Sequence, residues 1–270
     1  MQHKTRTIGL IFIIFGLFSL LACGPAQNNE AASDVAQEEE GAIHWEYVGD
    51  NGPENWGALN NAFSLCGTGT EQSPIDISGA TGTDLANLVF DYGSDSLELV
   101  HNGHTVQVNH NSGSSVTIDD ETYELVQFHF HAPSEHTING KSYPVEMHLV
   151  HANANGSLAV VGVMIDEGAA NDTLSAIWNH LPTEAGDPFT VTEVDVDAIN
   201  LLPKNRTTFR YNGSLTTPPC SEQVKWNVMT TPITMTADQI TAFEEAVVHQ
   251  NNRPLQPLND RTVQEDTTTN

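Results

Sequence analysis

The amino-acid sequence predicts a mainly β (α+β) fold in a single domain with peripheral helices. Three observations predict it: seven segments are apolar or alternate over the length of a strand, Asn-Gly pairs separate several of them, and only two segments have helical spacing. The 270 residues can bury one large core, and no internal repeat is visible between residues 43 and 259. These patterns leave the order of the strands open.

The predicted strands cover residues 97–101, 105–109, 115–118, 124–131, 145–151, 157–165 and 223–229. Tight turns between strands are favoured by the Asn-Gly pairs at 102–103, 139–140, 155–156 and 212–213. One predicted helix covers residues 172–180 and presents Leu174, Ile177 and Trp178 on one face. The other covers residues 237–250, with Thr236 or Asp238 as its N-cap.

The first 22 residues have the pattern of an export signal. Lys4 and Arg6 precede a nearly unbroken apolar run at residues 8–21, which is short for a membrane-spanning helix and typical of a signal-peptide core. The run ends in Leu-Leu-Ala-Cys-Gly, which resembles the lipobox of bacterial lipoproteins and makes Cys23 the lipidated first residue of the mature chain. An ordinary secretory signal with a chance cysteine is the alternative interpretation.

The segments that flank the domain are polar. Residues 23–42 contain an acidic run and no core-forming pattern, so we expect a flexible tether, and the polar tail at 262–270 is expected to fray. Together with the lipobox, this predicts a protein lipid-anchored to a bacterial membrane, on the periplasmic or cell-surface face. In that oxidising compartment Cys66 and Cys220 can pair.

Acidic side chains greatly outnumber basic ones in the chain as a whole. The sequence has 35 Asp and Glu against 9 Lys and Arg, for a formal net charge of −26. Because nucleic-acid phosphates would be repelled by this charge, nucleic acid is excluded as a partner.

Two predicted strands bring three histidines within reach of one another. His129 and His131 lie two apart and share a strand face, while the phenylalanines on either side of His129 point to the core. On the next strand Glu146 and His148 share a face, so pairing of the two strands would complete a three-histidine site. Three neutral nitrogens with an open fourth position are typical of catalytic zinc. A lone His-x-His is more often two unrelated histidines; the second strand argues against that alternative here.

The motifs around these histidines resemble the α-class carbonic anhydrases. The resemblance is carried by Gln-Phe-His-Phe-His at 127–131, Ser-Glu-His-Thr at 134–137, Glu-Met-His-Leu-Val-His at 146–151 and Ser-Leu-Thr-Thr-Pro-Pro-Cys at 214–220. Further matches run in family order over residues 43–261. The resemblance implies one domain around a large, mostly antiparallel twisted sheet. It also implies a lyase that hydrates CO2 reversibly to bicarbonate and a proton through a zinc-bound hydroxide.

The resemblance also implies roles for individual residues. Zn²⁺ would be held by His129, His131 and His148. Gln127 would hold His129, Glu146 would hold His148, and a backbone carbonyl would hold the third ring. Thr216 would be the gatekeeper that accepts a hydrogen bond from the nucleophile, and Glu135 would take the Thr216 proton. His104, in an Asn-Gly-His turn, would be the proton shuttle.

Other family positions line the cavity or lie outside it. The apolar wall for CO2 would consist of Val150, Val160, Leu215 and Trp226. Gln107 and Thr217 would lie on the polar side. His136 matches a buried structural position, and no role is expected for His101, His110, His151, His180 or His249.

Two alternatives come from other functional classes. A catalytically weak zinc-binding module of this fold would usually lack one of the zinc histidines, and this chain keeps all three. A zinc hydrolase acting on esters or peptides would require a different site. The chain has no His-Glu-x-x-His helix, and the matching carboxylate is assigned to Thr216.

Overall fold

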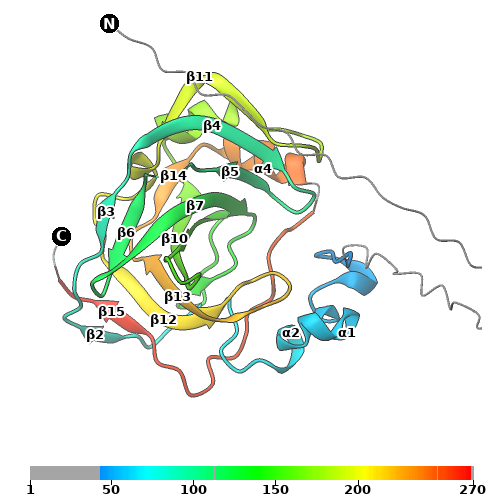
Figure 1. Cartoon of the computed structure of the whole chain (residues 1–270), viewed down its shortest axis with the longest axis vertical. Helices are drawn as coiled ribbons and strands as arrows, with labels where there is room; N and C mark the ends of the chain where they lie inside the picture. Colours follow the sequence, from blue (N-terminus) through cyan, green and yellow to red (C-terminus); the bar gives the residue numbers. More distant parts are fainter. Residues whose placement is uncertain (1–42, 112, 248, 269–270) are drawn as a thin grey trace, which may run out of the picture. The chain divides into compact units, whose positions relative to one another are not determined.

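The computed structural model describes residues 43–111, 113–247 and 249–268. Figure 1 shows a fold made mostly of strands, with helices at the periphery. The strands are β1 (Asp76–Ile77), β2 (Thr81–Thr83), β3 (Val89–Asp91), β4 (Ser94–His101), β5 (Val106–Asn109), β6 (Ser115–Ile118), β7 (Glu121–His131), β8 (Thr137–Ile138), β9 (Val145–Ala152), β10 (Leu158–Glu167), β11 (Phe189–Asp197), β12 (Thr208–Ser214), β13 (Glu222–Met229), β14 (Ile233–Met235) and β15 (Gln264–Asp266). The helices are α1 (Trp56–Leu59), α2 (Leu65–Thr68), α3 (Asp172–Trp178) and α4 (Ala237–Val247), with 3-10 turns η1 (Gly49–Asn51), η2 (Asn61–Phe63) and η3 (Ala198–Leu201).

Within these residues, thirteen strands form one large sheet. Its main path runs β11-β4-β5-β7-β9-β10-β13-β12-β15-β2, while β14 pairs with β10 and β6 joins β3 to β7. Three pairs are parallel, β10 with β13, β10 with β14 and β15 with β2, and the other pairs are antiparallel. The prediction of a large, mostly antiparallel sheet in a mainly β domain is therefore confirmed.

The predicted strands and helices all occur, with ends that differ by a few residues. The strand predicted at 124–131 begins three residues earlier, and both predicted helices end two or three residues sooner than expected. Thr236 caps α4: its hydroxyl accepts a hydrogen bond from the backbone N–H of Gln239, and the Gln239 side chain accepts one from Thr236 N–H.

The structure corrects the prediction that the tail after Arg261 frays. Strand β15 pairs with β12 on one side and β2 on the other, and Val263 just before it is buried. The segment is polar because it lies at the sheet margin, where backbone hydrogen bonds rather than apolar side chains hold it. Strands β11 and β12 were also not predicted, since acidic and polar residues interrupt their apolar pattern.

The two faces of the central strands bury different clusters. On one face Phe128 and Phe130 of β7 pack with Met147 and Leu149 of β9 beneath α3 and α4. On the other side a second cluster gathers around Trp226 of β13, with apolar residues from β10 and β12. The sheet therefore buries the phenylalanine face of β7, as the alternation predicted, and leaves its histidine face toward the second cluster.

A disulfide joins the N-terminal segment to the end of the Thr-Thr-Pro-Pro loop. Cys66 of α2 bonds to Cys220 across 154 residues of sequence, and Trp56 and Tyr47 pack around it. Residues 1–42, with the predicted signal peptide, Cys23 and tether, lie outside the described residues. In the described part of the chain, none of the helices has the length and apolar character needed to cross a membrane.

Breaking this disulfide should destabilise the protein strongly. The bond closes a loop of 154 residues, which on the chain-entropy model corresponds to about 5 kcal/mol. We expect the Cys66→Ser, Cys220→Ser protein to unfold at a much lower urea concentration than a Cys23→Ser control, which keeps the bond. Equal midpoints for the two proteins would contradict the assignment.

Buried His151, which lies outside the predicted three-histidine site, should make the stability of the fold depend on pH. Burial lowers the pKa of His151 to about 4, and its Nε2 lies 2.6 Å from the Tyr92 hydroxyl. Because the unfolded chain takes up this proton near pH 6.5 and the folded protein does not, stability falls as pH drops from 6.5 toward 4. Between pH 7.5 and pH 5, the free energy of unfolding measured in urea should fall by about 2 kcal/mol less for His151→Gln than for the native protein. Equal losses would contradict it.

Candidate metal centre and its cavity

A β-bulge aims the histidines of β7. Leu125 pairs with His151 and Gln127 pairs with Val150, so Val126 is an extra residue on β7 and is largely exposed. Leu125, just before the bulge, faces the same core cluster as Phe128 just after it. The extra residue thus shifts the alternation of side chains between the two faces by one position. The bulge thereby lets one strand bury Leu125 and still present Gln127 and the histidines beyond it on the opposite face.

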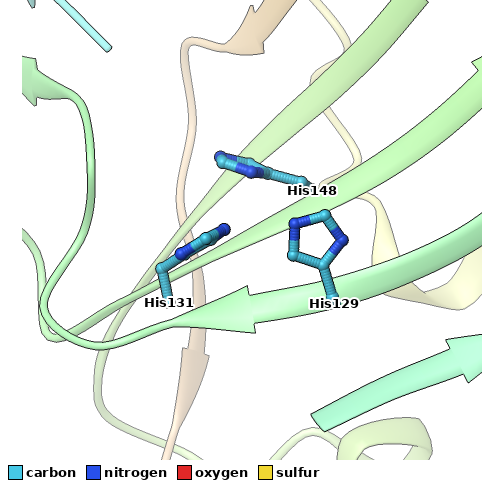
Figure 2. Close-up of side chains that lie close together, drawn as sticks. All are labelled: His129, His131 and His148. Atoms are coloured by element: carbon cyan, nitrogen blue, oxygen red, sulfur yellow. The ribbon is translucent and has the colours of Figure 1, made fainter. Parts of the chain in front are cut away.

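Strand pairing brings the third histidine beside the first two. In the register of β7 and β9, His129 lies opposite His148 and His131 lies opposite Glu146. One ring nitrogen from each histidine lies within 4.8 Å of the others. Figure 2 shows the three rings converging on one point, His129 and His131 from the end of β7 and His148 from β9.

Each ring is held from behind by a hydrogen-bond acceptor. His129 Nδ1 donates to Gln127 Oε1 at 2.8 Å, His131 Nδ1 to the Asn251 carbonyl at 2.6 Å, and His148 Nε2 to Glu146 Oε1 at 2.8 Å. These bonds fix each tautomer, because a neutral imidazole that donates from one nitrogen has a lone pair on the other. The three lone pairs therefore point inward.

The inner atoms of the cluster fit a divalent cation. His131 Nε2 is buried and has no hydrogen-bond partner among the described residues, and it lies 3.6 Å from Glu135 Oε2, which also lacks one. Buried polar atoms are almost always satisfied, so the unpaired His131 Nε2, grouped with nitrogens of His129 and His148, indicates a ligand. Three imidazole nitrogens without cysteine are the donor set of catalytic zinc.

Burial favours the neutral form of two of the rings, while the Glu146 charge acts on the third. Burial lowers the pKa of His131 and holds that of His129 well below its usual value, so both rings are neutral, as metal ligands must be. Burial works against the charge of Glu146, but the facing rings of His136 and His148 hold its pKa well below the usual range. Against burial, the Glu146 charge raises the pKa of His148.

A second cluster of potential ligands supports the first. His136 and Glu146 lie close to His148, but both ring nitrogens of His136 are engaged, Nδ1 with Glu146 Oε1 at 2.7 Å and Nε2 with the Tyr211 hydroxyl at 2.6 Å. No lone pair of His136 is free for a metal. His136 is buried, in agreement with the structural role expected for it.

A small cavity opens onto the histidines. Its volume is about 130 Å³, and it is lined by Trp45, Tyr47, Asn102, His104, Thr105, Gln107, Gln127, His129, His131 and Thr217. His104 and two of the metal-facing histidines therefore share one cavity, as do Gln107 and Thr217, the residues expected on its polar side.

Comparisons with known proteins agree with this geometry. The model of the eukaryotic-type carbonic anhydrase family matches residues 51–267. The carbonic anhydrase of Pectobacterium atrosepticum is 43% identical over 92% of this chain and 98% of that protein, and the one of Klebsiella pneumoniae is 46% identical over 82% and 91%. The solved α-carbonic anhydrase of Thermovibrio ammonificans, in complex with sulfanilamide, has a TM-score of 0.81 at 45% identity, covering 83% of this chain and all of that one.

The chain belongs to the α-class carbonic anhydrase family. It is an enzyme that hydrates CO2 reversibly to bicarbonate, and carbonic anhydrases of this class use zinc. The disulfide indicates an oxidising compartment, as expected for an exported carbonic anhydrase.

The carboxylate expected beside the metal is present and buried. Glu135 Oε1 accepts a hydrogen bond from Arg253 N–H at 2.8 Å, and its other oxygen lies 3.9 Å from His148 Nδ1. Thr216 is also buried, four residues before the disulfide-bonded Cys220. Oε2 of Glu135 accepts no hydrogen bond from any described residue, so it is free to accept one.

The expected CO2 wall forms one apolar cluster. Val160 and Trp226 are buried there, and Val150 and Leu215 pack against them. The Trp226 ring lies 4.8 Å from the His148 ring, so the cluster reaches the metal-facing histidines.

The cavity mouth holds His104 on an ordered turn. Asn102 Oδ1 accepts hydrogen bonds from the backbone N–H groups of His104 and Thr105, both at 3.0 Å. The His104 ring is half-buried and stacks on Trp45, with centroids 3.7 Å apart, and burial lowers its pKa. The ring therefore lies between the cavity and the surface.

Three residues of the site were not predicted from the sequence. Asn251 provides the acceptor for His131, and Trp45 and Tyr47 line the cavity beside His104. Trp45 and Asn252, the neighbour of Asn251, lie within residues 43–261, over which further matches to the family run. That resemblance was the sequence signal available for these positions. A backbone carbonyl leaves no mark in side-chain chemistry, so the role of Asn251 had none of its own.

Proposed function

We propose that this enzyme hydrates CO2 at a zinc ion held by His129, His131 and His148, with Glu135, Thr216 and His104 directing the reaction. One observation carries the assignment: each ring donates a hydrogen bond from its outer nitrogen to a fixed acceptor, so three lone pairs converge. Zinc bound there would lower the pKa of a water molecule to about 7 and so supply a nucleophile, for which carbonic anhydrase is the standard example.

Glu135 and Thr216 orient the reacting groups. The Glu135 oxygen that has no partner among the described residues can only accept, and in the active enzyme it would accept a hydrogen bond from the Thr216 hydroxyl, as the family resemblance implies. Thr216 then offers only lone pairs toward the cavity and must accept a hydrogen bond there. The backbone N–H of Thr216 binds an oxygen of the substrate. Gln127 and Glu146 hold the rings and take no part in bond making.

The shape of the pocket selects the substrate. Val150, Val160, Leu215 and Trp226 present an apolar surface, which accepts uncharged CO2 and favours release of the bicarbonate anion. Thr217 and Gln107 line the described cavity itself, whose lining includes none of these four apolar residues.

His104 moves the proton that the reaction releases. Its imidazole lies at the cavity mouth, half-buried, where it reaches both the interior and buffer. An imidazole takes up and releases a proton more readily than water does near pH 7, and the lowered pKa of His104 favours the release step.

Zinc binding should depend on His148. His148→Ala should bind less than a tenth of the native one zinc per chain and lose CO2 hydration, because two nitrogens on one strand cannot complete a tetrahedral site. His151→Ala, on the opposite face of the same strand, should keep one zinc per chain. Metal analysis of the purified proteins checks both; stoichiometric zinc in His148→Ala would contradict the assignment.

Proton transfer should depend on His104. His104→Ala should lower kcat in dilute buffer at least tenfold and leave kcat/KM for CO2 nearly unchanged, because proton transfer follows bicarbonate release. Added imidazole should restore most of the rate, and a His180→Ala control should behave as the native enzyme. An unchanged kcat for His104→Ala in dilute buffer would exclude His104 as the shuttle.

We further propose that the enzyme is exported and lipid-anchored. The division is a signal peptide at 1–22, lipidated Cys23, a tether at 23–42 and the enzyme domain from residue 43, whose sheet extends past residue 261 to include β15. The lipobox-like sequence and the disulfide support export. Gly24 after the cysteine favours the outer membrane where the host has one.

Membrane attachment should depend on Cys23. Several acyl chains are needed for firm anchoring, and Cys23→Ser removes the site that would carry them. The native protein should fractionate with membranes and the Cys23→Ser protein with the soluble fraction, at equal CO2 hydration activity. Cys23→Ser protein that stays in the membrane fraction would refute the lipobox interpretation.

A further inference from the structure

A chain of buried hydrogen bonds leads away from the metal centre. Beyond Glu146 it continues from His136 Nε2 to the Tyr211 hydroxyl at 2.6 Å, from there to Ser73 Oγ at 2.9 Å, and from Ser73 Oγ to the backbone N–H of Ser214 at 3.1 Å. Each of these side chains is at most 5% exposed. We call the series His148, Glu146, His136, Tyr211, Ser73 and Ser214 the relay.

The metal end of the relay fixes its direction. The Glu146 carboxylate only accepts: Oε1 receives His136 Nδ1 and His148 Nε2, and Oε2 receives the His136 backbone N–H at 2.8 Å. With its ring proton on Nδ1, His136 has a lone pair on Nε2. The Tyr211 hydroxyl must therefore donate to His136.

The far end of the relay requires the same direction. The Ser214 backbone N–H is an obligatory donor, so Ser73 Oγ accepts from it and donates its own proton to the Tyr211 oxygen. Burial raises the pKa of Tyr211 well above its usual value, so the phenol keeps the proton that it donates. Every donor thus has an acceptor, and the series ends on the carboxylate that holds His148.

We propose that Tyr211 is a positioning residue for the metal centre, which acts through His136 and Glu146 to hold the metal ligand His148 and so slows the loss of zinc. The proposal rests on the assignment of His148 as a zinc ligand. Tyr211 touches neither substrate nor metal, and its contribution is the hydrogen bond to His136 Nε2, which satisfies the buried ring and strengthens its Nδ1–H bond to Glu146.

Loss of that hydrogen bond has a defined consequence. Without the Tyr211 hydroxyl, His136 Nε2 is a buried acceptor without a partner, and the ring is no longer polarised toward Glu146, so its Nδ1–H bond to Glu146 Oε1 weakens. Glu146 then shifts, and the anchor of His148 loosens. Outer partners of metal ligands such as Glu146 typically change metal affinity by about 10–100-fold, so for Tyr211, two links beyond Glu146, we expect the lower end, about tenfold.

The surrounding packing keeps the relay in place and makes the test clean. A Cβ on Gly213 would collide with Ser73 Oγ, so the backbone of β12 lies directly against the relay. The Tyr211 ring lies nearly parallel to Trp226, at 10° and 6.3 Å. Tyr211→Phe keeps this ring contact and removes only the hydroxyl.

The test measures zinc loss from the full-length, zinc-loaded enzyme to an excess of a colorimetric chelator. Tyr211→Phe should release zinc about tenfold faster than the native protein. Tyr92→Phe is the matched control, because the Tyr92 hydroxyl also bonds a buried histidine, His151, outside the relay. It should lose similar stability in urea and release zinc within twofold of the native rate.

A second variant keeps the test decisive if Tyr211→Phe does not fold. Ser73→Ala removes the next hydroxyl of the relay and should speed zinc release in the same direction, by a smaller factor. Zinc release from the folded variants no faster than from Tyr92→Phe would overturn the proposal and leave Tyr211 a purely structural residue. Failure of the native protein to bind one zinc per chain would instead contradict the ligand assignment itself.

Discussion

The pairing of β7 with β9 is the constraint on which the rest of the site depends. It brings His129 opposite His148, and the bulge at Val126 turns the end of β7 so that its histidines face the same side. A slip of one residue would move those histidines into the apolar core and the phenylalanines into the cavity. The burial of Phe128 and Phe130 beneath α3 and α4 therefore holds the metal-facing rings in register.

Hydrogen bonds then set which ring nitrogen of each metal-facing histidine carries the lone pair. An imidazole can place its lone pair on either nitrogen, and the acceptors behind the rings remove that freedom. Buried Glu146 keeps its charge because two rings and a backbone N–H donate to it. Buried Glu135 keeps one oxygen free because the Arg253 backbone engages the other.

Local pattern predicted much of the fold and the core of the site, and distant pairing accounts for what it missed. Alternation on β7 was enough to assign faces to His129 and Phe128. It could not reveal the bulge, because Val126 fits an uninterrupted strand equally well. Strand β15 was interpreted as a fraying tail, since its pairing with β12 and β2 rests on backbone hydrogen bonds that composition does not show. The Asn251 carbonyl reaches His131 across 120 residues, which only the folded chain brings together.

X-ray absorption spectroscopy at the zinc edge of the native enzyme tests the central claim most directly. The geometry of His129, His131 and His148 predicts three imidazole nitrogens and one further light atom in a four-coordinate shell at about 2.0–2.1 Å. A shell that contains sulfur at about 2.3 Å, or fewer than three imidazoles, would contradict the account.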